Sequence, residues 1–109
     1  MAAPARTLID VPQKAKRGEV IAIKTLISHL METGFRHDNT GRPIARDIVT
    51  QFVCTYNGTE ICRADLFPAI SANPLFTFTT VATESGTLEF KWTGDNNFVL
   101  DATASITVE

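Results

Sequence analysis

The stretch RDIVTQFVCTYNGTEICRA, residues 46–64, decides the fold class of this chain. Over residues 46–56 apolar and polar side chains alternate, and a period of two is typical of a half-buried strand. Asn57 and Gly58 follow, and both tolerate the positive φ angles that a two-residue hairpin turn requires. Residues 59–64 then return as the partner strand, so the stretch predicts an antiparallel β-hairpin. One face of its first strand carries Ile48, Thr50, Phe52, Cys54 and Tyr56.

The same alternation continues on both sides of this hairpin. Further strands are predicted at residues 7–11, 19–29, 75–81, 87–93 and 98–108. No segment shows convincing helical periodicity, and residues 12–18 are predicted to be a solvated turn. The length of 109 residues is near the commonest size of a single domain. We therefore predict one all-β domain over residues 1–109, an immunoglobulin-like antiparallel β-sandwich of about seven strands.

The charge and composition of the chain argue against some classes of binding partner. The formal net charge is −2, with no clustered basic surface of the kind that nucleic acid binding needs, so no nucleic acid partner is expected. No run of eighteen apolar residues is present, and we expect neither a transmembrane helix nor a membrane partner. Residues 1–6 lack the charged and apolar regions of a signal peptide, which by itself indicates the cytoplasm.

The two cysteines are predicted to be unpaired thiols. With a two-residue turn, Cys54 faces Ile61 and Cys62 faces Val53, so the thiols point to opposite faces and cannot form a disulfide. A bulge in the hairpin would change this register. A reactive thiol needs a nearby base and a depressed pKa, and no base stands beside Cys54. We expect no catalytic residue.

Metal binding and other catalysis find little support in the sequence. The soft ligands available are His29, Met31, His37, Cys54 and Cys62. Zinc sites use ligand pairs at short spacing, and these residues form none. A blue-copper site places a histidine and a methionine after its cysteine, which is not the order here. There is no G-x-S-x-G motif for a serine nucleophile. We expect no metal and no cofactor.

Two segments break the strand pattern. Residues 30–45 are polar and longer than an ordinary connection, and they contain Phe35. Residues 66–74 are apolar without alternation, and two prolines keep them out of a central strand. Apolar side chains in such places are typical anchors of a protein interface, although they could equally cap the open ends of the sandwich. Over residues 30–47 the positively charged or titratable side chains Arg36, His37, Arg42 and Arg46 stand against Glu32, Asp38 and Asp47, which makes this stretch slightly cationic.

At these same places the sequence resembles the SoxZ family. The resemblance is carried by residues 18–29, 31–34, 68–74, 84–86 and 90–92, and it runs over nearly the whole chain. One departure is Leu30, where the family motif usually has proline. The resemblance implies a role in bacterial thiosulfate oxidation as one half of the SoxY–SoxZ sulfur carrier. In that pair the SoxY subunit bears sulfur intermediates on a glycine-flanked cysteine near its C-terminus.

Neither cysteine of this chain is flanked by glycine, so we expect the non-carrier half. The resemblance implies a heterodimer with a SoxY-like carrier subunit, contacts through that complex with the enzymes of the thiosulfate-oxidising system, and no enzymatic activity. It also implies the periplasm, reached by co-export with a signal-bearing partner. The candidate interface residues are His29, Met31, Glu32, Phe35, Arg36, Arg42, Phe67, Ile70, Asn73 and Pro74.

Two rival functions stay open at this point. A structural or adhesive immunoglobulin-like subunit would assemble with itself through an exposed edge strand. A thiol-dependent sulfur transferase would use Cys54 or Cys62 as its nucleophile.

Overall fold

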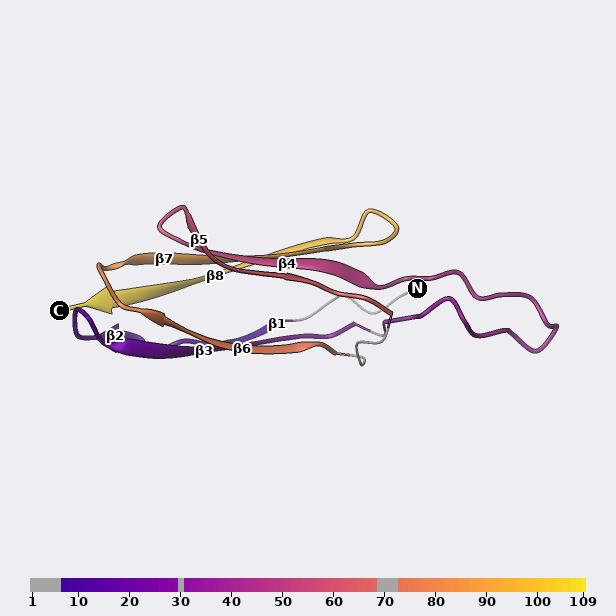
Figure 1. Ribbon diagram of the computed structural model, residues 1–109, viewed down its shortest axis with the longest axis horizontal. Coiled ribbons are helices and arrows are strands. Elements are labelled where there is room, and N and C mark those ends of the chain that lie inside the picture. Colours follow the sequence, from indigo (N-terminus) through magenta and orange to yellow (C-terminus); the bar gives the residue numbers. More distant parts are fainter. Residues whose placement is uncertain (1–6, 30, 69–72) are drawn as a thin grey trace.

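A computed structural model of the chain describes residues 7–29, 31–68 and 73–109. Over these residues the chain forms strands and no helix, in two layers that pack face to face (Figure 1). The strands are β1 (Thr7–Asp10), β2 (Lys14–Ala15), β3 (Val20–Ile27), β4 (Val49–Tyr56), β5 (Thr59–Asp65), β6 (Leu75–Val81), β7 (Gly86–Gly94) and β8 (Val99–Val108). The prediction of an all-β sandwich is confirmed.

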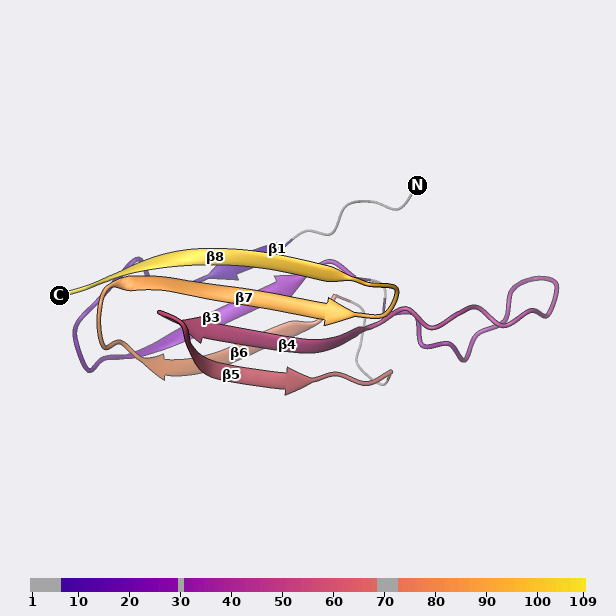
Figure 2. The ribbon, with the colours of Figure 1, turned by 90° about the horizontal axis from the view of Figure 1, so that it is seen from above.

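The strands divide into a three-stranded sheet of order β1-β3-β6 and a five-stranded sheet of order β2-β8-β7-β4-β5 (Figure 2). All neighbours are antiparallel except β2 and β8, which are parallel. The sequence missed β2, because two residues are too short to show alternation. Pro12 follows β1, after which the chain crosses to the other sheet and buries Ala15 beside the end of β8.

The core lies between the two inner faces. In β3 the predicted alternation holds, with Ile21, Ile23, Thr25 and Ile27 buried. Phe52 of β4 is fully buried at the centre: its ring stacks on Phe76 of β6 at a centroid distance of 4.8 Å and contacts Trp92 of β7 at 5.2 Å. Phe52 therefore joins three strands from both sheets. Phe78 of β6 faces the core but is only half-buried, because β6 is an edge strand.

The hairpin of β4 and β5 has the predicted turn but not the predicted register. Asn57 and Gly58 have φ angles of 49° and 84°, as a two-residue turn requires. A bulge then intervenes: Thr55 pairs with Glu60, whereas Cys54 pairs with Cys62. The prediction that the two thiols lie on opposite faces is wrong, because the extra residue on β5 shifts the register by one. Both cysteines are unpaired in the structure.

Residues 31–47, here called the arm, connect β3 to β4. Its two halves run side by side and are bridged at Glu32–Asp47 and at His37–Pro43. Figure 1 shows the arm extending away from the sandwich along the long axis, and the whole molecule measures 60 × 25 × 18 Å. The arm therefore does not fold back over the open end of the sandwich as a cap.

Among the residues that the structure describes, none forms a helix of the length and apolar character that a membrane span needs.

The central ring of Phe52 provides a test of this packing. Phe52→Ala should lower the free energy of unfolding by about 3–5 kcal/mol, because it removes a fully buried aromatic side chain and leaves a cavity. Val53→Ala, on the opposite face of the same strand, should cost about 1 kcal/mol or less. Urea denaturation of the parent and both variants measures the difference. Equal losses in the two variants would contradict the described packing.

Candidate protein interface

The base of the arm is fixed by main-chain pairing and by a buried side chain. Glu32 and Asp47 each donate an N–H to the carbonyl of the other, at 2.8 Å in both directions. Met31 precedes this pair and is 4% exposed, with a left-handed φ of 55° that few residues other than glycine adopt. The N–H of Val49 lies 3.3 Å from the Met31 sulfur. Met31 therefore anchors the arm in the core.

A bidentate ion pair ties the arm to the turn between β7 and β8. Arg46 donates through Nε and Nη2 to the two carboxylate oxygens of Asp95, at 2.8 and 2.9 Å. The same carboxylate accepts the N–H of Ile48 at 3.2 Å. The Arg46 guanidinium holds the pKa of the Asp95 carboxyl below its usual range, and the Ile48 bond acts in the same direction. Planar, two-point pairing fixes orientation as well as distance.

The outer part of the arm is ordered by its own side chains. Arg36 donates two hydrogen bonds to the Glu32 carboxylate, at 3.0 and 2.7 Å. At the tip the Asp38 carboxylate accepts from the N–H and hydroxyl of Thr40 and from the N–H of Arg42. The expected cationic character is therefore reduced, because Arg36 and Arg46 are both ion-paired. The Phe35 side chain, by contrast, is 78% exposed to solvent.

A second contact joins the start of the arm to the segment before β6. His29 donates its N–H to the side-chain oxygen of Asn73 at 2.9 Å, and Asn73 returns its own N–H to the His29 carbonyl at 2.6 Å. The His29 ring accepts the N–H of Met31 through Nδ1 and lies edge-on to Phe98, with the ring centres 5.0 Å apart. The His29 ring is therefore held by contacts to Met31 and Phe98, and it helps to position the arm.

The predicted interface residues thus separate into two groups. Phe35, Arg36, Arg42, Phe67 and Asn73 are exposed, with Phe67 at 65%. Met31 and Pro74 are buried and His29 and Glu32 are half-buried, so these four support the surface rather than form its outer layer. Leu66, read from the sequence as part of an unburied run, is buried at 3%. Ile70 lies outside the described residues.

The sequence missed three further apolar side chains at this end of the sandwich. Leu8 is 66% exposed, Leu75 is 62% exposed and Val99 is 55% exposed. Leu8 and Leu75 flank Leu26 in one cross-strand row on the outer face of the smaller sheet. Their signal in the sequence was weak, because each lies near the start of its strand at a position that faces away from the core.

These side chains gather at one end of the molecule. In the described part of the chain, five of the seven exposed large apolar residues lie on the arm or where strands meet its base. We call these five the arm-end apolar set: Leu8, Phe35, Phe67, Leu75 and Val99. The other two, Val20 and Val81, pair with each other at the opposite end. Figure 2 shows the arm, the end of β5 and the β7–β8 turn together at one end.

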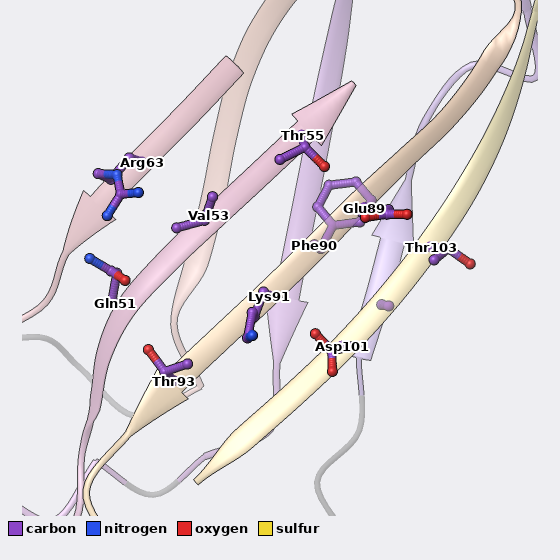
Figure 3. Close-up of a pocket in the computed structure, with 11 residues that line it drawn as sticks. Gln51, Val53, Thr55, Arg63, Glu89, Phe90, Lys91, Thr93, Asp101 and Thr103 are labelled. Atoms are coloured by element: carbon purple, nitrogen blue, oxygen red, sulfur yellow. The ribbon is translucent and has the colours of Figure 1, made fainter. Parts of the chain in front are cut away.

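A shallow hollow of about 640 Å³ lies on the outer face of the larger sheet, and charged side chains project into it (Figure 3). Arg63 and Lys91 project into it, as do Glu89 and Asp101. Lys91 stands directly opposite Asp101 in the strand register, and Arg63 is paired with Glu60. Because its positive and negative charges balance, the hollow has no marked preference for an anion or a cation.

The thiols are held in their protonated form. Burial raises the pKa of the Cys54 thiol to about 12, with a further contribution from the neighbouring Cys62. Burial also raises the pKa of the Cys62 thiol, and the nearby Glu60 carboxylate raises it further. The thiolate is the nucleophilic form, so neither thiol is activated at neutral pH. Within the described ranges, no group of three or more His, Cys, Asp or Glu side chains could hold a metal ion.

Comparison with solved structures places the fold among β-sandwich proteins. The sulfur carrier protein SoxY from Chlorobium limicola f thiosulfatophilum matches with a TM-score of 0.68 and 11% identity, over 94% of this chain and 78% of that one. The superoxide reductase (neelaredoxin) of Ignicoccus hospitalis matches with a TM-score of 0.71 and 19% identity, over 94% and 80%. A CARDB domain from Pyrococcus furiosus matches with a TM-score of 0.61 and 16% identity, over 97% and 88%.

A search of curated protein sequences gave no match.

The fold defines a small β-sandwich protein of the immunoglobulin-like class. The family comparison is more specific, because residues 9–105 match the description "Sulphur oxidation protein SoxZ". The chain belongs to the SoxZ family, as the resemblance in the sequence predicted, and is a subunit of the Sox sulfur-oxidation system.

The ion pair at the arm base predicts a specific response to pH. Arg46 lowers the pKa of Asp95 in the folded state. The ion pair therefore stabilises the fold at neutral pH, and this stabilisation is lost as the pH falls through the lowered pKa. An NMR titration should therefore show Asp95 protonating below the value of an ordinary aspartate, together with a change at the Ile48 amide. In Arg46→Ala the midpoint should rise toward the ordinary value. An unchanged midpoint in that variant would show that the ion pair does not form.

Proposed function

We propose that this chain is the non-catalytic subunit that binds a SoxY-type sulfur carrier and holds it through the arm-end surface. The observation that carries the proposal is the arm-end apolar set, which lies on the arm and on the strand ends next to its base in a chain of the SoxZ family. Exposed apolar side chains gathered in one place are typical of protein interfaces, where a few buried aromatic residues supply most of the binding energy.

The arm is suited to this role because it is ordered before it binds. Its base is fixed by the Arg46–Asp95 pair and by the buried Met31, while Phe35 remains exposed. A surface that is already ordered loses little conformational entropy on association. Arg42 forms no ion pair among the described residues, and it would be the arm's available cation for an acidic group on the partner.

The sulfur chemistry itself would belong to the partner. In this proposal the SoxY-type subunit carries the intermediates on its own cysteine, and the present chain contributes binding and a docking surface for the enzymes of the system. The raised pKa values of Cys54 and Cys62 support this assignment, since both thiols stay protonated at neutral pH. We also propose, from the family resemblance, that the complex works in the periplasm, which fractionation of cells expressing both subunits would test.

Aromatic truncation at the arm end tests the interface. Phe35→Ala and Phe67→Ala should each weaken binding of a purified SoxY-type subunit by at least about tenfold, the scale of a well-packed aromatic contact. Val20→Ala is the matched control, because Val20 is 64% exposed at the opposite end. Isothermal titration calorimetry gives the dissociation constants. If both phenylalanine variants bind like the parent, or if Val20→Ala is equally weakened, the arm end is not the interface.

Removal of the thiols tests the non-catalytic assignment. The variant with Cys54→Ala and Cys62→Ser should support thiosulfate turnover by the reconstituted system at the parent rate. Cys54→Ala should reduce the free energy of unfolding by about 1–2 kcal/mol, because the packing of a buried sulfur is lost. Intact mass spectrometry of the parent chain after turnover should show no sulfur adduct. Lost turnover in a folded double variant, or a stable adduct on the parent, would place the chemistry on this chain.

A further inference from the structure

The two sheets have four edge strands, and three of them carry features that discourage pairing with another chain. β1 has four residues and ends with Asp10 close to Pro12. β2 has only two residues, and the part of β8 that it leaves unpaired carries a charge at Asp101. β5 has a bulge after Glu60 and charged side chains at Arg63 and Asp65. Short length, charge, proline and bulges are the usual protection of sheet edges.

β6 has none of these features. Its sequence, LFTFTTV from Leu75 to Val81, contains no charge, no proline and no glycine, and it pairs with β3 over seven residues without a break. In the described part of the chain no strand pairs with its other side. Uncharged strands of high β-propensity readily accept another strand when their edge is open.

The hydrogen-bond ladder shows which groups of β6 are available. The carbonyl of Pro74 accepts from Ile27, and the N–H of Ala82 donates to Glu19, so even-numbered residues of this segment bond to β3. Because antiparallel ladders alternate, the N–H and C=O groups of residues 75, 77, 79 and 81 point away from β3. These four residues also have their side chains exposed on the outer face of the sheet.

The outward residues are self-complementary. Read in either direction they are apolar, threonine, threonine, apolar: Leu75, Thr77, Thr79 and Val81. We propose that β6 pairs antiparallel with β6 of a second copy of this chain, about a two-fold axis at Phe78. In this register Leu75 lies opposite Val81 of the other copy, and Thr77 lies opposite Thr79. The two smaller sheets then form one continuous sheet of six strands, with every outward backbone group paired.

The charges nearby are compatible with this arrangement. The nearest charged residue on the same face is Lys24 of β3, which stands directly opposite Asp10 of its own β1. In the paired sheet one cross-strand row runs from Lys24 to Thr77 of one copy and on to Thr79 and Ala22 of the second copy. No like charges face each other across the axis. The new strand also covers Phe76 and Phe78, which are half-buried at the edge of a single copy.

This edge differs from the arm-end surface in the groups that it uses. The arm-end apolar set offers side chains, including that of Leu75, whereas the β6 edge offers backbone groups along the side of the sandwich. Self-association of the chain alone is therefore measured independently of carrier binding.

Sedimentation equilibrium of the full chain without carrier tests the proposal. The parent should form a dimer whose population rises with concentration. Thr79→Pro removes one outward N–H in each copy without touching the β3 ladder, so two hydrogen bonds are lost and dimerisation should weaken by at least about tenfold. Thr79→Val keeps the N–H and the β-branched shape, and it should dimerise like the parent. A parent that is monomeric at all concentrations, or a folded Thr79→Pro that dimerises normally, overturns the proposal. Equal weakening in both variants also overturns it, because side chains rather than backbone would then hold the contact.

Amide exchange in the parent gives a second test that needs no variant. In dilute solution the amides of Thr77 and Thr79 should exchange much faster than those of Phe76 and Phe78. At concentrations where the dimer forms, all four should be protected. Fast exchange of Thr77 and Thr79 in the concentrated sample contradicts the pairing. Protection that appears only when a SoxY-type subunit is added also contradicts it, and assigns the edge to the carrier instead.

Discussion

Phe52 lies between the two sheets, and the rest of the structure depends on its contacts. Its ring stacks on Phe76 from the smaller sheet and lies against Trp92 from the larger one. An antiparallel sheet must bury one apolar face, and here both sheets do so against the same aromatic group. This packing sets the distance between the sheet that contains β3 and the sheet that contains β4. The arm is the connection between those two strands.

The arm has an ordered shape because its base is held from three directions. Met31 anchors it in the core, Arg46 binds Asp95 on the β7–β8 turn, and the His29–Asn73 bonds join it to the segment before β6. Each of these contacts uses a polar or adaptable side chain to join segments that are distant in the sequence. The result is a long connection that can present Phe35 to another protein with little loss of conformational freedom.

The bulge in β5 has two consequences that are unrelated in function. It interrupts an edge strand that would otherwise be open to another chain, and it brings Cys54 and Cys62 into register. Both thiols nevertheless stay protonated at neutral pH, because burial raises the pKa of each. The contrast with β6 is informative, because that strand has neither bulge nor charge at its free edge. These edge strands of the two sheets thus differ in how they can meet other proteins.

The sequence by itself determined the fold class, seven of the strands and the Asn57–Gly58 turn, because alternation and turn chemistry are local properties of the backbone. It also located the long connection that forms the arm and identified Phe35 and Phe67 as candidate interface residues, whose exposure only the structure decided. The tertiary structure decided the bulge beside Ile61, the pairing of β2 with β8, the burial of Met31 and the ion pair that joins Arg46 to a residue 49 positions away. Those features depend on which strands become neighbours and how the two sheets close on each other. No periodicity within a single segment encodes that information.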